Sequence, residues 1–167
     1  MESFGSDGEV DMNRLAQPLM RVPVPWVFVL AYLVGAALEK IRPLTIRPDT
    51  AAITTIGGAA LFAVGAVIAG WCLTIFRKAH TTTIPGKSSV RLVTWGPYRA
   101  TRNPMYVGLT LAYLGEAGLL KQVWPVLLLP LVIAYLNYTV IPVEEARLKE
   151  AFADTYERYR SSVRRWM

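Results

Sequence analysis

The chain has 167 residues, of which 53% are hydrophobic, with a mean hydropathy of +0.34, a net charge of +6 and a pI near 9.7. This apolar content is high for a soluble protein and favours an integral membrane protein. The basic residues flank apolar runs, where they set membrane orientation, so nucleic acid is not expected as a partner. Because Cys72 is the single cysteine and His80 the single histidine, neither a disulfide framework nor a metal site is expected.

Residues 1–18 are polar and lack the apolar centre of a signal peptide, which predicts a flexible leader before one integral-membrane domain, 19–167. Four apolar runs follow: 22–38, 50–76, 105–120 and 122–143. The second and fourth can cross roughly 30 Å of hydrocarbon at about 1.5 Å per residue, and the first and third are near the lower limit. We therefore predict an all-α fold, a polytopic membrane bundle of about four transmembrane helices with a C-terminal cytoplasmic helix.

Two patterns predict how these helices pack. Small residues recur on one face of the second run, where a neighbouring helix could approach closely: Ala59, Ala63, Ala66 and Gly70. Only Lys121 and Gln122 separate the third run from the fourth, which predicts a tight antiparallel helical hairpin.

The distribution of positive charge predicts the orientation. With four spans, the leader, the 77–103 loop and the C-terminal tail lie on one side of the membrane. The other side holds only four of the 18 lysines and arginines: Lys40, Arg42, Arg47 and Lys121. By the positive-inside rule, both termini are expected to be cytoplasmic.

The segment "GPYRATRNPMYVG", residues 96–108, stands where the third run begins. Asn103 followed by Pro104 is a good helix start, since asparagine caps free amides and proline suits the first turn. Two arginines and two tyrosines crowd the same helix end: Arg99, Arg102, Tyr98 and Tyr106. A helix N-terminus beside arginines is a ready anion site, but an anchor in the lipid headgroup zone would use the same residue types, and both interpretations stay open.

The tail predicts a helix that leaves the membrane after the fourth run. Apolar residues recur along it at three- and four-residue steps: Leu148, Phe152, Tyr156, Tyr159 and Val163. Glu144 lies on this stripe and is the carboxylate expected to face a buried site. The alternative is a structural ion pair with Arg102 or Arg99.

The positions of three further polar residues in the helices predict their roles. Glu145 points about 100° away from Glu144, so we expect it to form an ordinary surface pair with Lys149. Glu116 interrupts a membrane run, where a carboxylate is costly enough to suggest function, although it could also reach headgroups near the hairpin turn. Asn137 is expected to join helices by hydrogen bonds.

The sequence "LVTWGPYRATRNPMYVG", followed by "EEARL" and then "VRRW", resembles the integral-membrane methyltransferases of the isoprenylcysteine carboxyl methyltransferase and phospholipid methyltransferase superfamily. The resemblance covers residues 81–166, the expected catalytic region. It implies S-adenosylmethionine as methyl donor, S-adenosylhomocysteine as product, a cofactor site at the cytoplasmic end of the bundle, and a lipophilic acceptor that enters from the bilayer.

The resemblance also implies site residues. Those expected to bind the cofactor are Arg91, Leu92, Val93, Tyr98, Arg102, Asn103, Pro104, Met105, Tyr106 and Glu144. Catalytic roles are expected for Glu116 and Arg147. Where the family usually has histidine before the proline, this chain has Asn103, so a general base is not expected there. An arginine that the prenylcysteine enzymes carry before the glutamate pair is also missing, so either Arg147 substitutes for it or the acceptor is not a prenylcysteine, which we favour.

Two other functions are alternatives. An NADPH-dependent membrane reductase of the sterol-reductase type has a similar C-terminal region, but the intact "RNPMY" and "EEARL" argue against it. The second alternative is a non-catalytic membrane protein that binds a lipid. The oligomeric state is not predicted.

Overall fold

The computed structural model describes residues 23–44, 50–78 and 91–167, and no strand occurs among them. Their helices, in chain order, are α2 (Val24–Ile41), α3 (Ala51–Lys78), the short 3-10 helix η2 (Gly96–Arg99), α4 (Pro104–Leu119), α5 (Trp124–Tyr135), the π-helical turn η3 (Leu136–Val140) and α6 (Ile141–Ser162). The all-α prediction is confirmed. The expected leader and His80 lie outside the described residues.

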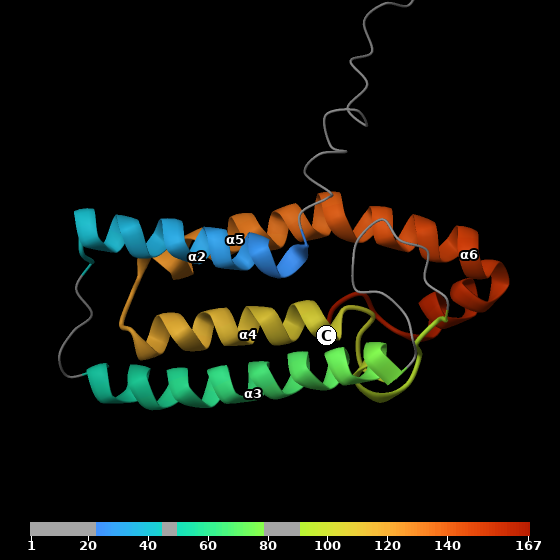
Figure 1. Ribbon diagram of the computed structural model, residues 1–167, viewed down its shortest axis with the longest axis horizontal. Coiled ribbons are helices and arrows are strands. Elements are labelled where there is room, and N and C mark those ends of the chain that lie inside the picture. The colour runs from blue at the N-terminus through green and yellow to red at the C-terminus, as the bar shows by residue number, and fades with distance from the viewer. Residues whose placement is uncertain (1–22, 45–49, 79–90) are drawn as a thin grey trace, which may run out of the picture.

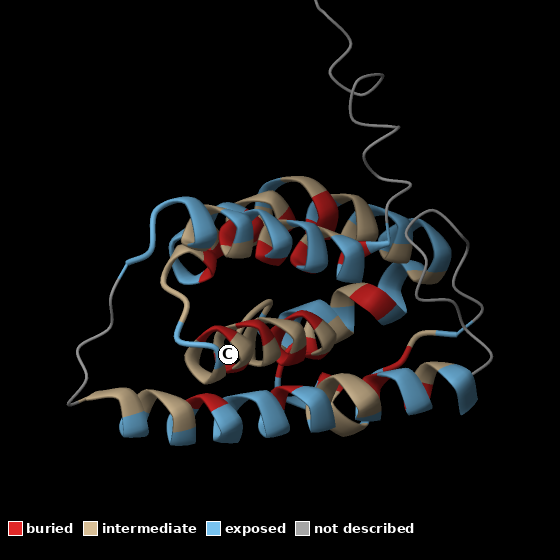
Figure 2. Ribbon diagram, turned by 60° about the vertical axis from the view of Figure 1, so that its left-hand side comes forward, coloured by how far each residue is buried: buried red, intermediate tan, exposed pale blue. Residues whose placement is uncertain are grey.

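Three helices in the described part are long and apolar enough to cross a membrane: α2, α3 and the continuous helix Trp124–Ser162 that α5, η3 and α6 form together. At 16 residues, α4 is shorter and lies alongside them as the fourth helix of the bundle (Figure 1). Figure 2 shows buried residues on the facing sides of the helices and exposed residues on the outer side of α3. The exposed outer residues are largely apolar, as a lipid-facing surface requires.

The tightest contact joins α3 to α4. A Cβ atom placed on Gly58 would lie 2.6 Å from the Leu119 nitrogen, and one placed on Gly108 would lie 2.8 Å from the Ala69 nitrogen. The same lack of room occurs at Gly65 and Gly115. We call Gly58, Gly65, Gly108 and Gly115 the glycine seam, where two backbones touch because no side chain separates them.

The predicted packing face of α3 was wrong. Ala59, Ala63 and Ala66 are exposed, and a Cβ atom on Gly70 would meet nothing within 4 Å. The true contact face lies about 100° around the helix, one position away, where glycine rather than alanine allows backbone contact.

At one end of the bundle, Glu39 ties α2 to α5. Its carboxylate accepts hydrogen bonds from the backbone nitrogens of Val123, at 2.9 Å, and Trp124, at 3.0 Å. The predicted tight turn between α4 and α5 is present, since Gln122 N donates to the Ala117 carbonyl at 2.9 Å. Because α4 lies against α3 and α5 against α2, this turn joins two helix pairs (Figure 1).

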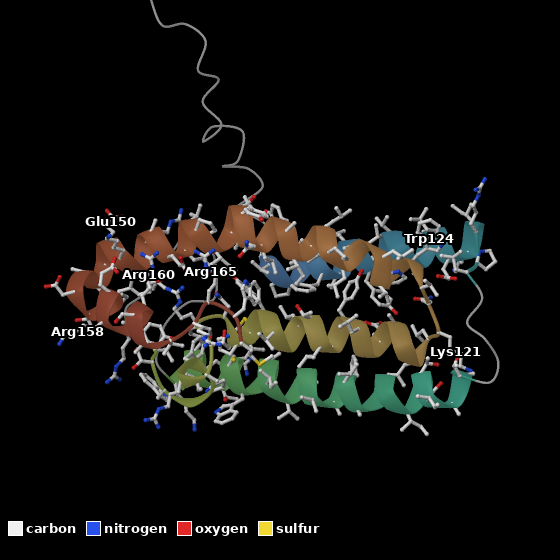
Figure 3. The ribbon with its side chains drawn as sticks, turned by 180° about the vertical axis from the view of Figure 1, so that it is seen from behind. Lys121, Trp124, Glu150, Arg158, Arg160 and Arg165 are labelled. Atoms are coloured by element: carbon white, nitrogen blue, oxygen red, sulfur yellow. The ribbon has the colours of Figure 1, made fainter. Side chains whose placement is uncertain are left out.

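The tail is helical, as predicted, but it continues the fourth span and then bends. At Ala153 the backbone has φ 40° and ψ −121°, a conformation that residues other than glycine rarely adopt. The second half of α6 therefore folds back toward the start of α4, and the chain ends there (Figure 1). In Figure 3, Lys121 and Trp124 mark one end of the bundle, and Glu150, Arg158, Arg160 and Arg165 lie toward the other.

Candidate functional site

Four segments meet at the end of the bundle where α4 begins: η2, the first turn of α4, the start of α6 and the last residues of the chain. The Tyr106 hydroxyl donates to Glu144 Oε1 at 2.7 Å, across 38 residues of sequence. Tyr106 is buried and the bond is part-buried, so it is partly screened from water. This pair brings the two sequence motifs together in space.

The start of α4 follows from its sequence, with one correction. Pro104 occupies the first turn, and the Asn103 carbonyl accepts hydrogen bonds from the nitrogens of Tyr106, at 3.1 Å, and Val107, at 3.2 Å. The predicted side-chain cap was wrong, because Asn103 makes no capping bond. Its Nδ2 instead donates to the Arg165 carbonyl at 3.0 Å, so the last residues of the chain take the side chain that would have capped the helix.

Tyr98 forms one buried wall beside this helix start. Its ring meets Phe76 edge-on at 5.6 Å between centroids, and its carbonyl accepts the Tyr159 hydroxyl at 2.8 Å. Burial, and then the neighbouring Cys72 thiol, raise the pKa of Tyr98, so its hydroxyl stays protonated and available as a donor. Gly96, with φ 64°, provides the turn just before Tyr98, and a Cβ atom there would lie 2.9 Å from Ile75 Cδ1.

The other residues expected to bind the cofactor near the start of α4 differ in how far they are buried. Val93 is buried with Tyr98, and Met105 packs against the same cluster. Leu92 is partly buried, whereas Arg91 is exposed with its guanidinium carbon 5.7 Å from the centre of the Trp95 ring. The apolar members of the set therefore face the interior, and the charged one lies outside it.

The prediction for Glu145 was wrong. Its side chain is only 13% exposed and pairs with Arg102 Nη2 at 3.3 Å and with Arg165 Nη2 at 2.7 Å. The expected partner, Lys149, instead pairs with Glu157 at 3.0 Å. Spacing along one helix could not reveal this, because both arginines come from other segments: Arg102 precedes α4, and Arg165 follows the bend in α6.

Arg102 is only partly satisfied in its hydrogen bonding. Its side chain is 11% exposed, and its Nε and Nη1 are buried without a hydrogen-bond partner. Buried guanidinium groups that lack a partner are unfavourable, so these donors suit an incoming anion. The alternative prediction for Glu144 was an ion pair with Arg102, but Arg102 pairs with Glu145, the residue next to Glu144.

Residues 163–167, which we call the C-terminal strap, close this end of the bundle. The Arg165 carbonyl accepts the Thr101 hydroxyl at 2.9 Å, and the Arg164 carbonyl accepts the Arg102 nitrogen at 2.9 Å. Trp166 Nε1 donates to Asn137 Oδ1 at 3.2 Å. The roles of Thr101, Arg165 and Trp166 were not predicted from the sequence. The motif "VRRW", which contains Arg165 and Trp166, was recognised only as a part of the family pattern.

The structure does not bring the two expected catalytic residues into the Tyr106–Glu144 pair. Glu116 lies ten positions beyond Tyr106 on α4, about 15 Å along the helix axis, near the hydroxyls of Tyr32 and Tyr113. Arg147 is exposed on α6, three positions after Glu144 and close enough to interact with it electrostatically.

An open groove of about 660 Å³ runs along α5 toward this end of the bundle. The walls of the groove are mainly apolar, and its polar groups come from Asn137 and Tyr138 in η3 and from Trp166 in the strap. The lining residues are Val126, Leu129, Pro130, Ile133, Ala134, Asn137, Tyr138 and Trp166. Asn137 precedes Glu144 by seven positions on one continuous helix, which is roughly 10 Å. The groove therefore leads from an apolar surface toward the site.

Comparison with known proteins gave one match. The family model described as phospholipid methyltransferase matches residues 53–155, more than half of the chain. No curated protein and no solved structure matches the chain. The matched range includes α4, η3 and the first part of α6, and ends before the C-terminal strap.

Proposed function

Because the chain belongs to the phospholipid methyltransferase family, a family of membrane methyltransferases, we propose that it moves a methyl group from S-adenosylmethionine to a lipophilic acceptor in the bilayer. The observation that carries the proposal is the part-buried Tyr106–Glu144 hydrogen bond at one end of a membrane bundle. It joins the two motifs that the resemblance assigns to the cofactor. We propose both the identity of the cofactor and the lipophilic nature of the acceptor.

The chemistry of the side chains suits this cofactor. S-adenosylmethionine carries a carboxylate, an ammonium group, a sulfonium and ribose hydroxyls. The Glu144 carboxylate can accept from the ammonium or hydroxyl groups, and the unpartnered donors of Arg102 suit the carboxylate. The aromatic faces of Tyr98 and Tyr106 suit a cationic sulfonium. The residues present therefore fit the group.

When bound, the cofactor supplies an electrophilic methyl group. The protein residues need to align the two reactants in line and exclude water, and no protein nucleophile is required. Tyr106 on α4 and Glu144 on α6 would orient the cofactor. Val93 and Met105 contribute an apolar wall, and the C-terminal strap covers the start of α4. Asn103 has no group that titrates near neutral pH, so we assign it a binding role.

Titration of the purified protein in detergent with S-adenosylhomocysteine and with NADPH tests the proposal. We expect S-adenosylhomocysteine to bind, and Glu144→Ala and Tyr106→Phe each to weaken it about tenfold or more. Glu150→Ala, an exposed carboxylate on the same helix, is the matched control and should leave binding unchanged. Binding of NADPH alone would favour the reductase, and binding of neither compound would favour a non-catalytic protein.

The groove along α5 supports a lipophilic acceptor with an extended apolar chain, since it is open, mainly apolar and lies along a helix that is apolar enough to cross a membrane. Incubation with membrane lipid extract and labelled methyl donor should yield one labelled lipid. Ala134→Trp, which fills the groove, should lower that labelling without changing S-adenosylhomocysteine binding. Ala37→Trp, on an exposed position of α2, is the control. Equal labelling in all three proteins would place the acceptor elsewhere.

We also propose that both termini and the site face the cytoplasm, as the positive-inside rule implies. Lys121→Cys and Arg158→Cys introduce thiols at opposite ends of the bundle, and Cys72 is fully buried and should stay unlabelled. In intact cells an impermeant thiol reagent should label only the Lys121→Cys protein. The reverse pattern would invert the topology.

A further inference from the structure

The C-terminal strap places one side chain where three segments meet. Arg165 donates from Nε to Glu145 Oε1 at 3.1 Å and from Nη2 to Glu145 Oε2 at 2.7 Å. Its Nη1 also reaches Asn137 Oδ1 at 3.4 Å. Arg165 therefore links the strap to both η3 and α6, and it uses both oxygens of the Glu145 carboxylate.

Arg102 shares that carboxylate on unequal terms. It makes a single contact, from Nη2 to Glu145 Oε1 at 3.3 Å, while its Nε and Nη1 have no partner. The other groups that interact with Arg102 electrostatically are the hydroxyls of Tyr156 and Tyr159 and the carboxylate of Glu157. Glu157 is already engaged with Lys149 and Arg160. Two guanidinium groups thus share one carboxylate, and one positive charge is left over at Arg102.

The competition between the two arginines has a consequence for Arg102. A guanidinium and a carboxylate pair best side by side, through two parallel hydrogen bonds. If Arg165 were absent, Glu145 could form that bidentate pair with Arg102 and occupy the donors that are now free. The presence of Arg165 on both oxygens prevents this.

We propose that Arg165 is a positioning residue that keeps the free edge of Arg102 available for the carboxylate end of the cofactor. This inference rests on the proposed function. It assigns a role to a residue outside the part of the chain that the family model matches. Arg165 acts through Glu145 and need not touch the cofactor itself.

Two ligands isolate the effect: S-adenosylhomocysteine and its decarboxylated analogue, which keeps the adenosine and the amine. Calorimetry on the full chain in detergent should give the wild-type protein a preference of about tenfold or more for the carboxylate-bearing ligand. Arg165→Met should abolish most of this preference by weakening S-adenosylhomocysteine only. Arg164→Met removes the exposed neighbouring side chain and should leave the preference unchanged.

A second variant separates positioning from simple structural support. In the double variant Arg165→Met/Glu145→Gln, the residue at 145 is neutral and no longer captures Arg102, so the preference should return to about the wild-type level. A preference that stays lost in the double variant, or equal losses for both ligands in Arg165→Met, would overturn the inference, as would a wild-type protein that binds both ligands equally. Failure of the wild-type protein to bind either ligand would instead overturn the proposed function, and the inference with it.

Discussion

The glycine seam and the junction at the start of α4 hold the same helix by opposite means. Along the seam, Gly65 and Gly115 let two backbones touch, and no polar side chain takes part. At the junction, Arg102, Glu145 and Arg165 connect segments that are distant in sequence through charged groups. The seam fixes α4 rigidly against a membrane helix, whereas the junction sets which polar groups face the site. The difference indicates that helix packing and site assembly can be disturbed separately.

Breaking the seam should have the largest effect. Gly115→Leu forces a side chain into the backbone of α3, and we expect a loss of about 3 kcal/mol or more in the free energy of unfolding. Thermal unfolding in detergent measures it. Gly57→Ala, where the added Cβ would meet nothing within 4 Å, is the control and should not destabilise the protein. A wild-type melting temperature for Gly115→Leu would contradict the close approach of α3 and α4.

Breaking the junction should cost less stability than breaking the seam. Glu145→Ala leaves two buried or half-buried arginines without their carboxylate, and we expect a loss of about 2 kcal/mol in stability, whereas the preference for the carboxylate-bearing ligand should persist because nothing captures Arg102. Glu150→Ala is again the exposed control. If Glu145→Ala unfolded at the same temperature as Glu150→Ala, Glu145 would be an ordinary surface residue.

The bend in α6 should give the smallest change, and a gain. Ala153 has a positive φ, which glycine adopts without a steric penalty, so Ala153→Gly should raise the stability by about 1 kcal/mol. Ala151→Gly, two positions earlier at a regular helical position, should lower it by about 1 kcal/mol. Opposite signs in unfolding experiments would confirm the bend, and equal losses would argue for a straight helix.

Much of the fold could be predicted because its determinants are local. The apolar runs place α2, α3 and α4 within a few residues, and Pro104 marks where α4 begins. The resemblance assigned Tyr106 and Glu144 to the same cofactor, but their direct hydrogen bond was not predicted. Their closeness in space, at 2.7 Å, fits the cofactor role that both are proposed to share.

Two of the errors share one physical cause, which is that the partners of Asn103 and Glu145 were expected close in sequence. Asn103 could cap its own helix, but the Arg165 carbonyl takes its side chain. Glu145 could pair with Lys149 one turn away, but two arginines from other segments have better geometry. The packing face of α3 was misplaced by one position, since only the contact with α4 decides between alanine and glycine.

The sequence by itself determined that this is a helical membrane protein and where its helices begin, because hydrophobic run length and proline act locally, while the family resemblance linked the two motifs. The tertiary structure alone decided how the arginines share Glu145 and where the strap lies. Both depend on the bend at Ala153, which reverses the chain and brings residues 163–167 back to the start of α4. No local pattern predicts such a reversal, because its stabilising contacts are made with residues about sixty positions away.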